Sequence, residues 1–282
     1  MQISQGEKVG KNLRSTCETM KEYWETRLKA NFTSKGVGHI GFSRSYNELL
    51  YLVRKVSFLN KMPRHIKNIA NASVLDIGSG TGFYLNLWLR LRAGAITGSD
   101  ITKVAAQGLK LSFPMARILE VDIGASDAMS VFGDDRYDII SAMDVLYHIV
   151  DDSRYETAFS NVTSLLKPGG VFVFSENFLR TGTQRAGHQV SRSMREIVNI
   201  LRRHGLVQVC RFPQFYIMNA PVDTQSRIAH NYWRAWKYLI GRNELLGASL
   251  GGLLLPVELL LVTLARESIS SEIMICRKPS EF

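Results

Sequence analysis

The feature that most constrains this fold is a glycine-rich turn at residues 78–82, between an apolar run and a helical pattern. Residues 73–77 are apolar enough for a buried parallel strand, and apolar positions at helical spacing begin at Phe83. Glycines at alternate positions let the backbone turn sharply and approach a ligand closely, because they carry no Cβ. The start of the helix adds unpaired N–H groups and a positive dipole end. This order predicts a nucleotide site on an open α/β sheet.

The rest of the chain alternates between strand and helix patterns. Further strands are predicted at residues 95–99, 116–121, 137–142, 171–175, 206–212 and 271–277. One intervening helix should begin at a capping box formed by Ser193 and Glu196 and end at Gly205. We therefore expect a Rossmann-like α/β fold, whose seven-stranded, mostly parallel sheet is covered by helices on both faces.

The chain of 282 residues divides into four predicted segments. These are an N-terminal helical cap (1–70), a ligand-binding core (71–212), a helical insertion or lid (213–269) and the final strand of the core (270–282). Apolar positions between residues 20 and 28 share one helical face, which we expect to pack on the core. The alternative is a lid over the site, with Tyr23 and Trp24 near a substrate. A second cap helix, from residue 46 to 59, should end before Pro63.

The insertion is too long for a simple loop and should hold two helices. The first lies near residues 224–240 and is rich in tryptophan and tyrosine, and the second covers the almost entirely apolar residues 245–265. The length of the second would just span a bilayer. Pro256 and Glu258 interrupt the apolar run and three glycines weaken it. We expect a buried or substrate-covering helix pair, with membrane contact as the alternative.

Charge and cysteine content limit the environment of the protein. The net charge is +10, and residues 180–244 hold eleven Lys or Arg against three Asp or Glu, which supplies +8 of it. A basic face there would suit an anionic partner, or it is simply a solvated surface. The three cysteines, Cys17, Cys210 and Cys276, are far apart and form no zinc pattern. Together with a polar N-terminus that lacks a signal-peptide core, they favour a cytoplasmic protein, with peripheral membrane contact as the alternative.

Acidic side chains follow five predicted strands, at the edge where an open parallel sheet binds ligands. They are Asp76, Asp100, Asp122, Asp144 and Glu176. Helix capping alone does not explain five of them. A carboxylate at Asp100 can accept hydrogen bonds from ribose hydroxyls of several cofactors. The Asp122 carboxylate can accept from an adenine amino group, while the N–H of Ile123 donates to the ring.

These motifs, in this order, resemble the class I S-adenosylmethionine (SAM)-dependent methyltransferases, most of all the group that acts on small molecules. The resemblance covers about residues 73–176, including Asp76-x-Gly-x-Gly-x-Gly, the segment 137–149 and Leu-Lys-Pro-Gly-Gly at 166–170. It implies SAM as the cofactor. The implied binding set is Asp76, Gly78 and Gly80 around the methionine part, Asp100 at the ribose, Asp122 and Ile123 at the adenine, the backbone of Met143 at the methionine amino group, and also Ser79, Gly82 and Ile101.

Methyl transfer from a sulfonium is an in-line displacement, which requires an aligned nucleophile and, for a hydroxyl, a proton acceptor. His148 is the best candidate base, because its position matches the resemblance and its ordinary pKa suits neutral pH. A purely structural role for His148 is the alternative, and Tyr147 and Glu176 are weaker candidates. We expect no metal. The alternative is Mg²⁺ held by Asp144, Glu176 and Asn177, whose oxygens are suitable ligands.

We expect a methyltransferase that acts on a small or medium hydroxyl-bearing acceptor: a sugar or glycan unit, a lipid-linked intermediate or a natural product. N-methylation, RNA methylation and a non-catalytic SAM-binding role are alternatives. Nucleic acid is not the expected partner, because residues 143–146 lack the Asn/Asp-Pro-Pro-aromatic segment of amino-methyltransferases. A nicotinamide-dependent oxidoreductase is disfavoured, because the turn lacks the third glycine of G-x-G-x-x-G. The oligomeric state stays open.

Overall fold

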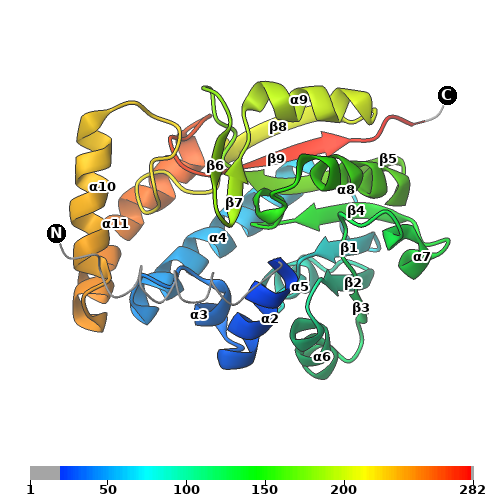
Figure 1. Cartoon of the computed structure of the whole chain (residues 1–282), viewed down its shortest axis with the longest axis horizontal. Coiled ribbons are helices and arrows are strands. Elements are labelled where there is room, and N and C mark those ends of the chain that lie inside the picture. Colours follow the sequence, from blue (N-terminus) through cyan, green and yellow to red (C-terminus); the bar gives the residue numbers. More distant parts are fainter. Residues whose placement is uncertain (1–19, 281–282) are drawn as a thin grey trace.

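A single seven-stranded sheet organises the computed structural model, which describes residues 20–280, the side chains of residues 34 and 35 excepted (Figure 1). The strands are β1 (Ser73–Ile77), β2 (Ala95–Asp100), β3 (Arg117–Glu120), β4 (Tyr137–Ala142), β5 (Leu166–Glu176), β8 (Val207–Pro213) and β9 (Glu272–Arg277), in the order β3-β2-β1-β4-β5-β9-β8. The first five run parallel, and β9 is antiparallel to both of its neighbours. The predicted Rossmann-like fold and its seven strands are confirmed. Because the chain order reverses between β1 and β4, ligands are expected to bind at the carboxyl ends of these strands.

Helices cover both faces of this sheet. They are α2 (Met20–Ala30), α3 (Ser34–Val37), α4 (Arg44–His65), α5 (Phe83–Arg90), α6 (Lys103–Ser112), α7 (Ala128–Phe132), α8 (Asp152–Leu165), α9 (Met194–Arg203), α10 (Arg227–Ile240) and α11 (Glu244–Leu264), with a 3₁₀ turn η1 (Leu146–His148). Alternate residues of β5 point to opposite faces of the sheet and pack in two different hydrophobic clusters. Phe172 and Phe174 pack in the cluster that contains α8 and α9, whereas Val171 and Val173 pack in the cluster that contains α4, α5 and α6.

Two details differ from the sequence-based expectation. The capping box of α9 is only half formed. The hydroxyl of Ser193 accepts the Glu196 N–H at 3.3 Å, but the N–H of Ser193 donates to Thr183. Thr183 directly precedes a small hairpin, which was not predicted. The hairpin consists of β6 (Gln184–Ala186) and β7 (Gln189–Ser191) and leads into the start of α9.

The expected end of α4 before Pro63 is wrong. The helix continues to His65, and the N–H of Ile66 still donates to the carbonyl of Met62 at 2.9 Å. Pro63 lies in the last turn, so it removes one hydrogen bond without interrupting the helix interior. Met62 and Ile66 are both buried in the core beside the sheet, and their burial keeps the chain helical past the proline.

The two predicted helices of the insertion are present, but α11 is not a buried helix. Two of its three glycines, Gly247 and Gly251, make close contacts, whereas Gly252 faces open space. A Cβ on Gly247 would lie 1.8 Å from the Ser43 hydroxyl, and one on Gly251 would lie 2.6 Å from Leu49, so both allow close packing on α4. Figure 1 shows α10 and α11 beside α4 at one end of the molecule. Within residues 20–280, α11 is the one helix that is long and apolar enough to cross a membrane, and only 22% of its most apolar window is buried.

The buried carboxylate of Glu258 fastens α11 to the segment that follows β8. It accepts the backbone N–H groups of Tyr216, Ile217 and Met218 at 2.7, 2.8 and 3.2 Å. The side chain is fully buried, and burial raises its pKa. The residue that interrupts the apolar run is therefore directed inward, where its charge is satisfied by three donors.

We predict that Glu258→Ala lowers the free energy of unfolding by about 2–5 kcal/mol, because three buried N–H groups lose their acceptor. Urea denaturation measures this change. Leu260→Ala on the same helix is the control and should cost less than about 1 kcal/mol, because Leu260 is 57% exposed. Equal losses in the two variants would contradict this role of Glu258.

Candidate active site

The turn after β1 has the left-handed backbone that its glycines were expected to allow. Gly78, Gly80 and Gly82 have φ angles of +67°, +54° and +86°. The turn also lies close to the end of β4, since a Cβ on Gly78 would lie 2.3 Å from the Val145 side chain. The N–H of Ser79 donates to the carbonyl of Ser99 at 2.9 Å, which joins the turn to β2. Any side chain at these glycines would be strained, and at Gly78 and Gly82 it would also clash with a neighbouring side chain.

The carboxylate of Asp100, at the end of β2, closes this turn. One of its oxygens accepts the Gly80 N–H at 2.9 Å, and the other accepts the N–H and the hydroxyl of Thr102 at 2.9 and 2.8 Å. Burial raises the pKa of Asp100, although these three hydrogen bonds oppose the shift. A carboxylate has about four acceptor positions, so Asp100 has room for one further donor such as a ribose hydroxyl. The predicted pair of ribose hydrogen bonds would require one present donor to give way.

Asp76 supports the turn from below. It is 2% exposed, and its carboxylate accepts the hydroxyl of Ser141 on β4 at 2.6 Å. The same Ser141 oxygen accepts the indole N–H of Trp88 at 2.9 Å, and the backbone carbonyl of Asp76 accepts the Ser79 hydroxyl at 2.8 Å. Burial raises the pKa of Asp76 to about 7. The side chain therefore holds β1, β4 and α5 together beneath the turn.

At the end of β3, Asp122 is already engaged by the protein. Its carboxylate accepts the Gly124 N–H at 2.9 Å and forms an ion pair with Arg154 of α8. Ile123 is buried, and its carbonyl accepts the side-chain amide of Asn161 at 2.8 Å. An adenine amino group bound to Asp122 would share the carboxylate with Arg154. Sequence reasoning missed Arg154, because an arginine near the start of a helix gives no signal of its own.

The residues after β4 form a polar cluster around Asp144, whose φ angle is +61°. The carboxylate of Asp144 forms an ion pair with Arg54 of α4 at 3.0 Å and accepts hydrogen bonds from Gln214 at 3.1 Å and Ser175 at 2.9 Å. The Arg54 guanidinium lies over the Tyr51 ring, 5.0 Å from its centre. This cluster connects the cap, β5 and the segment after β8. Sequence reasoning missed both Arg54 and Gln214.

Glu176, at the end of β5, is enclosed by other side chains. It is completely buried, and one carboxyl oxygen accepts the hydroxyl of Tyr155 at 3.1 Å. Burial raises its pKa to about 8, although the positive charge of the nearby Arg192 opposes the shift. A pKa raised in this way favours the protonated form near neutral pH, which weakens Glu176 as a general base.

The oxygens that were considered for Mg²⁺ have other partners. Asp144 is paired with Arg54, the Glu176 carboxyl accepts the Tyr155 hydroxyl at 3.1 Å, and the side-chain amide of Asn177 donates to Ser191 at 2.6 Å. Between residues 20 and 280 no group of three or more His, Cys, Asp or Glu is placed to hold a metal ion. A Mg²⁺ ion held by Asp144, Glu176 and Asn177 would have to displace these partners.

His148 lies in η1, which follows β4. One neighbouring carbonyl determines which of its ring nitrogens carries the proton. Its Nδ1 is 3.0 Å from the backbone carbonyl oxygen of His188. Because a carbonyl can only accept, Nδ1 carries the proton and the lone pair of the neutral ring is on Nε2. Burial lowers the pKa of His148 to about 4, so the ring is neutral at physiological pH. Burial raises the pKa of the adjacent Tyr147 hydroxyl well above its ordinary value, which argues against Tyr147 as a base.

Helix α2 lies across this edge of the sheet. The ring of Trp24 meets the ring of His148 edge to face, with 5.1 Å between their centres, and Arg27 lies over Trp24 at 4.8 Å. At the β2 side, α2 contacts α6, where Glu25 accepts the N–H of Val104. Only Leu28 of α2 is fully buried. The contacts match the lid alternative as well as packing on the core. The predicted cap before residue 20, with Cys17, lies outside the described residues.

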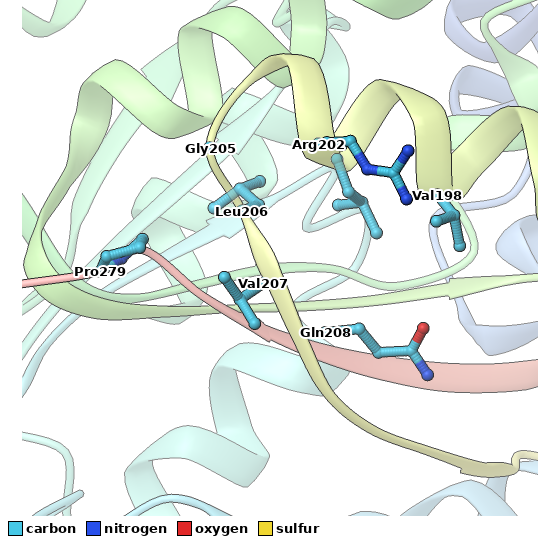
Figure 2. Close-up of a pocket in the computed structure, with 8 residues that line it drawn as sticks. Val198, Arg202, Gly205, Leu206, Val207, Gln208 and Pro279 are labelled. Carbon is cyan, nitrogen blue, oxygen red and sulfur yellow. The ribbon is translucent and has the colours of Figure 1, made fainter.

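A separate hollow of about 420 Å³ lies at the opposite edge of the sheet (Figure 2). It is lined by Val198, Leu201, Arg202, Gly205, Leu206, Val207, Gln208 and Pro279. Val207 is paired with Arg277, which in turn is paired with Val171 at the amino-terminal half of β5. This hollow is therefore not part of the cluster at the carboxyl ends of the strands.

Comparisons with known proteins agree with this geometry. Residues 47–217 match the profile of a protein family described as "Methyltransferase domain". A ubiquinone biosynthesis O-methyltransferase of Albidiferax ferrireducens is 23% identical over 60% of this chain and 69% of its own. An mRNA cap guanine-N(7) methyltransferase of Arabidopsis thaliana is 27% identical over 57% of this chain and 50% of its own, so this chain spans about half the length of that relative.

A solved structure shows the same fold. The O-methyltransferase of a trans-AT polyketide synthase multienzyme of Brevibacillus brevis, in complex with S-adenosyl-L-homocysteine, has a TM-score of 0.54 against this chain. It is 18% identical, and the likeness covers 86% of this chain and 82% of that one.

We predict that the free energy of unfolding falls as the pH rises from the ordinary pKa of Glu176 to its raised pKa in the folded protein. Between its ordinary pKa of 4.5 and its raised pKa of about 8, the folded protein keeps a proton that the unfolded chain has lost. Glu176→Gln should therefore lose less stability than the wild type between about pH 5 and pH 8, measured by urea denaturation. The raised pKa of Asp76 lowers the stability in the same direction, but it does so equally in both proteins and drops out of the comparison.

Glu156→Gln is the control for this experiment. The ion pair of Glu156 with Arg203 lowers its pKa, so it is ionised across the whole range and its loss should leave the slope unchanged. Parallel pH curves for the wild type and Glu176→Gln would show that Glu176 is ionised in the folded protein.

Proposed function

This chain belongs to the methyltransferase domain family and is a SAM-dependent methyltransferase, and we propose that it methylates a hydroxyl group of a small or medium-sized acceptor by in-line displacement. The acceptor class is a sugar or glycan unit, a lipid-linked intermediate or a natural product. The observation that supports the proposal is the contact of His148 Nδ1 with the His188 carbonyl, which leaves the lone pair on Nε2; we propose that this atom takes the hydroxyl proton.

The proposed cofactor site fits the residues that are present. Gly78 and Gly80 provide a turn without side chains, Asp100 has one acceptor position left, and Asp122 presents a carboxylate at the next strand end. SAM supplies a methyl group on a positively charged sulfur. The role of the turn is to hold the cofactor close, and the role of Asp100 is to fix it through the ribose. Met143 is buried, so only its backbone is proposed to contact the methionine part.

Trp24 is proposed as a positioning residue for the base. Its ring closes over His148, and burial holds the pKa of that histidine at about 4. A neutral His148 accepts a proton only while the hydroxyl is being methylated, so alignment of the acceptor must provide much of the rate. Good alignment is worth up to about 7–11 kcal/mol in favourable cases. Exclusion of water by α2 serves the same purpose.

O-methylation is preferred to N-methylation for a chemical reason. A neutral amine attacks a sulfonium without a base, whereas a hydroxyl needs its proton removed as the bond forms. A positioned, singly protonated histidine therefore favours a hydroxyl acceptor. The similarity to a ubiquinone biosynthesis O-methyltransferase supports this choice, and the similarity to a guanine-N(7) methyltransferase supports N-methylation as the second candidate.

The apolar helix α11 and the basic helix α10 favour an amphiphilic or anionic acceptor, and a cytoplasmic enzyme that works beside a membrane. Radiolabelled SAM offered with paired acceptors, one water-soluble and one lipid-linked, tests this choice. Faster methylation of the lipid-linked acceptor is expected. Equal rates for the two acceptors would contradict the preference for an amphiphilic acceptor.

We predict that His148→Ala lowers kcat about 10²–10⁴-fold with the better of these two acceptors, because the proton acceptor is lost. Binding of SAM, measured by calorimetry, should remain. The matched control is His204→Ala, because His204 follows α9 and pairs with Glu156 near the opposite edge of the sheet. An unchanged kcat in His148→Ala would show that His148 is structural.

We also predict that kcat/KM of the wild type does not fall between about pH 8 and pH 5.5 through protonation of His148, because its pKa of about 4 lies below this range. Trp24→Ala exposes the ring to water, which raises its pKa towards the ordinary value of 6.5. The acidic limb of the pH–rate profile should then move to higher pH. Identical profiles in the two proteins would contradict the positioning role of Trp24.

A further inference from the structure

Exposed apolar side chains line the outer face of α11. Leu253, Val257, Leu260 and Leu264 are 72, 47, 57 and 71% exposed. Their spacing of four, three and four residues places them on one side of the helix. Soluble proteins rarely leave so large a contiguous apolar surface uncovered without a partner.

The acidic groups around this face are all directed elsewhere. Glu258 is buried against backbone N–H groups. At one end of α11 the Glu244 carboxylate accepts the N–H groups of Arg44 and Ser45. Beyond the other end Glu267 forms ion pairs with Arg180 and Arg211. The face between residues 245 and 265 therefore presents no negative charge to a partner.

Helix α10, which packs beside α11, adds positive charge. Arg227, His230, Arg234 and Lys237 follow helical spacing and, together with Asn231 and Trp233, line a shallow hollow of about 630 Å³. Ile228 and Tyr238 of the same helix are 83 and 68% exposed. The two helices thus combine basic, aromatic and aliphatic side chains, the composition of surfaces that lie in the interface of an anionic bilayer.

We propose that α10 and α11 dock the enzyme on a membrane surface that contains anionic lipids, with α11 lying in the interface and not crossing the bilayer. A crossing orientation would place Glu258 and the α4 contacts at Gly247 and Gly251 in hydrocarbon. Charge complementarity selects the bilayer over a second copy of this chain, because a copy would bring a second set of Arg227, Arg234 and Lys237 to the interface.

This surface is connected to the active site through α4. One part of α4 packs on α11, and its Arg54 forms the ion pair with Asp144 after β4. Docking would therefore place a helix that contributes to the site beside the interface where amphiphilic acceptors collect. The proposal goes beyond methyl transfer and needs neither SAM nor an acceptor to be tested, so its failure is separate from a failure of the proposed reaction.

Flotation with vesicles tests the proposal directly. The full chain is mixed with vesicles of phosphatidylcholine alone or of phosphatidylcholine with phosphatidylglycerol, at low and at high salt. We expect binding to the anionic vesicles to be at least about tenfold stronger than to the neutral ones and to weaken with salt. Leu253→Gln/Leu260→Gln/Leu264→Gln should weaken anionic binding at least about tenfold, because less apolar surface enters the interface.

Two further variants complete the design. Arg234→Glu/Lys237→Glu should lose most of the salt-dependent part of binding. Leu111→Gln/Met115→Gln changes residues that are 85 and 97% exposed outside this surface and should bind like the wild type. All changes are at exposed positions, and the thermal melting of each variant checks its fold.

The proposal is overturned if the wild type does not bind the anionic vesicles, or if the α11 variant binds them as well as the wild type does. Equal binding to neutral vesicles would overturn the role of α10. Sedimentation equilibrium without lipid tests whether a second copy of this chain covers the face instead. A dimer that the α11 variant dissociates, together with absence of vesicle binding, would assign the face to a second copy of this chain.

Discussion

The carboxylate of Asp100 holds the turn on which the whole site depends. Three glycines give that turn its left-handed backbone, and such a backbone is flexible unless something fixes it. Asp100 does so by accepting the Gly80 N–H, while its other oxygen is occupied by Thr102. The price is a buried charge, whose pKa rises on burial. The turn, β2 and α6 are therefore fixed relative to one another before any ligand binds.

Burial also determines the protonation states around the turn. Asp76 and Glu176 have raised pKa values of about 7 and 8, and His148 has a lowered value of about 4. All three shifts reduce the charge at the carboxyl ends of β1, β4 and β5. Of the other strand-end acids, Asp144 is balanced by Arg54 and Asp122 by Arg154, which leaves Asp100 without a cationic partner among these pairs. A site with little net charge of its own suits a positively charged sulfonium that loses its charge during the reaction.

The sequence predicted the strands and the strand-end acids well, because a buried parallel strand and a glycine turn have strong local patterns. It could not predict Arg54, Gln214 or Arg154, because each reaches the site from a distant element through tertiary packing. The burial of Asp76 and Glu176 was missed for the same reason, since an acid at a strand end can face the ligand or the core. For α11, composition suggested burial, and only the packing of Gly247 and Gly251 on α4 shows which face stays outside.

Calorimetric titration of the wild type and of Asp100→Asn with SAM, S-adenosylhomocysteine and NADH tests the central claim most directly. The wild type should bind the first two in the micromolar range and not bind NADH. Asp100→Asn should bind them at least about tenfold more weakly, because the turn loses a charged acceptor and the ribose loses its partner. Binding of NADH, or equal affinity of the two proteins for S-adenosylhomocysteine, would contradict the account.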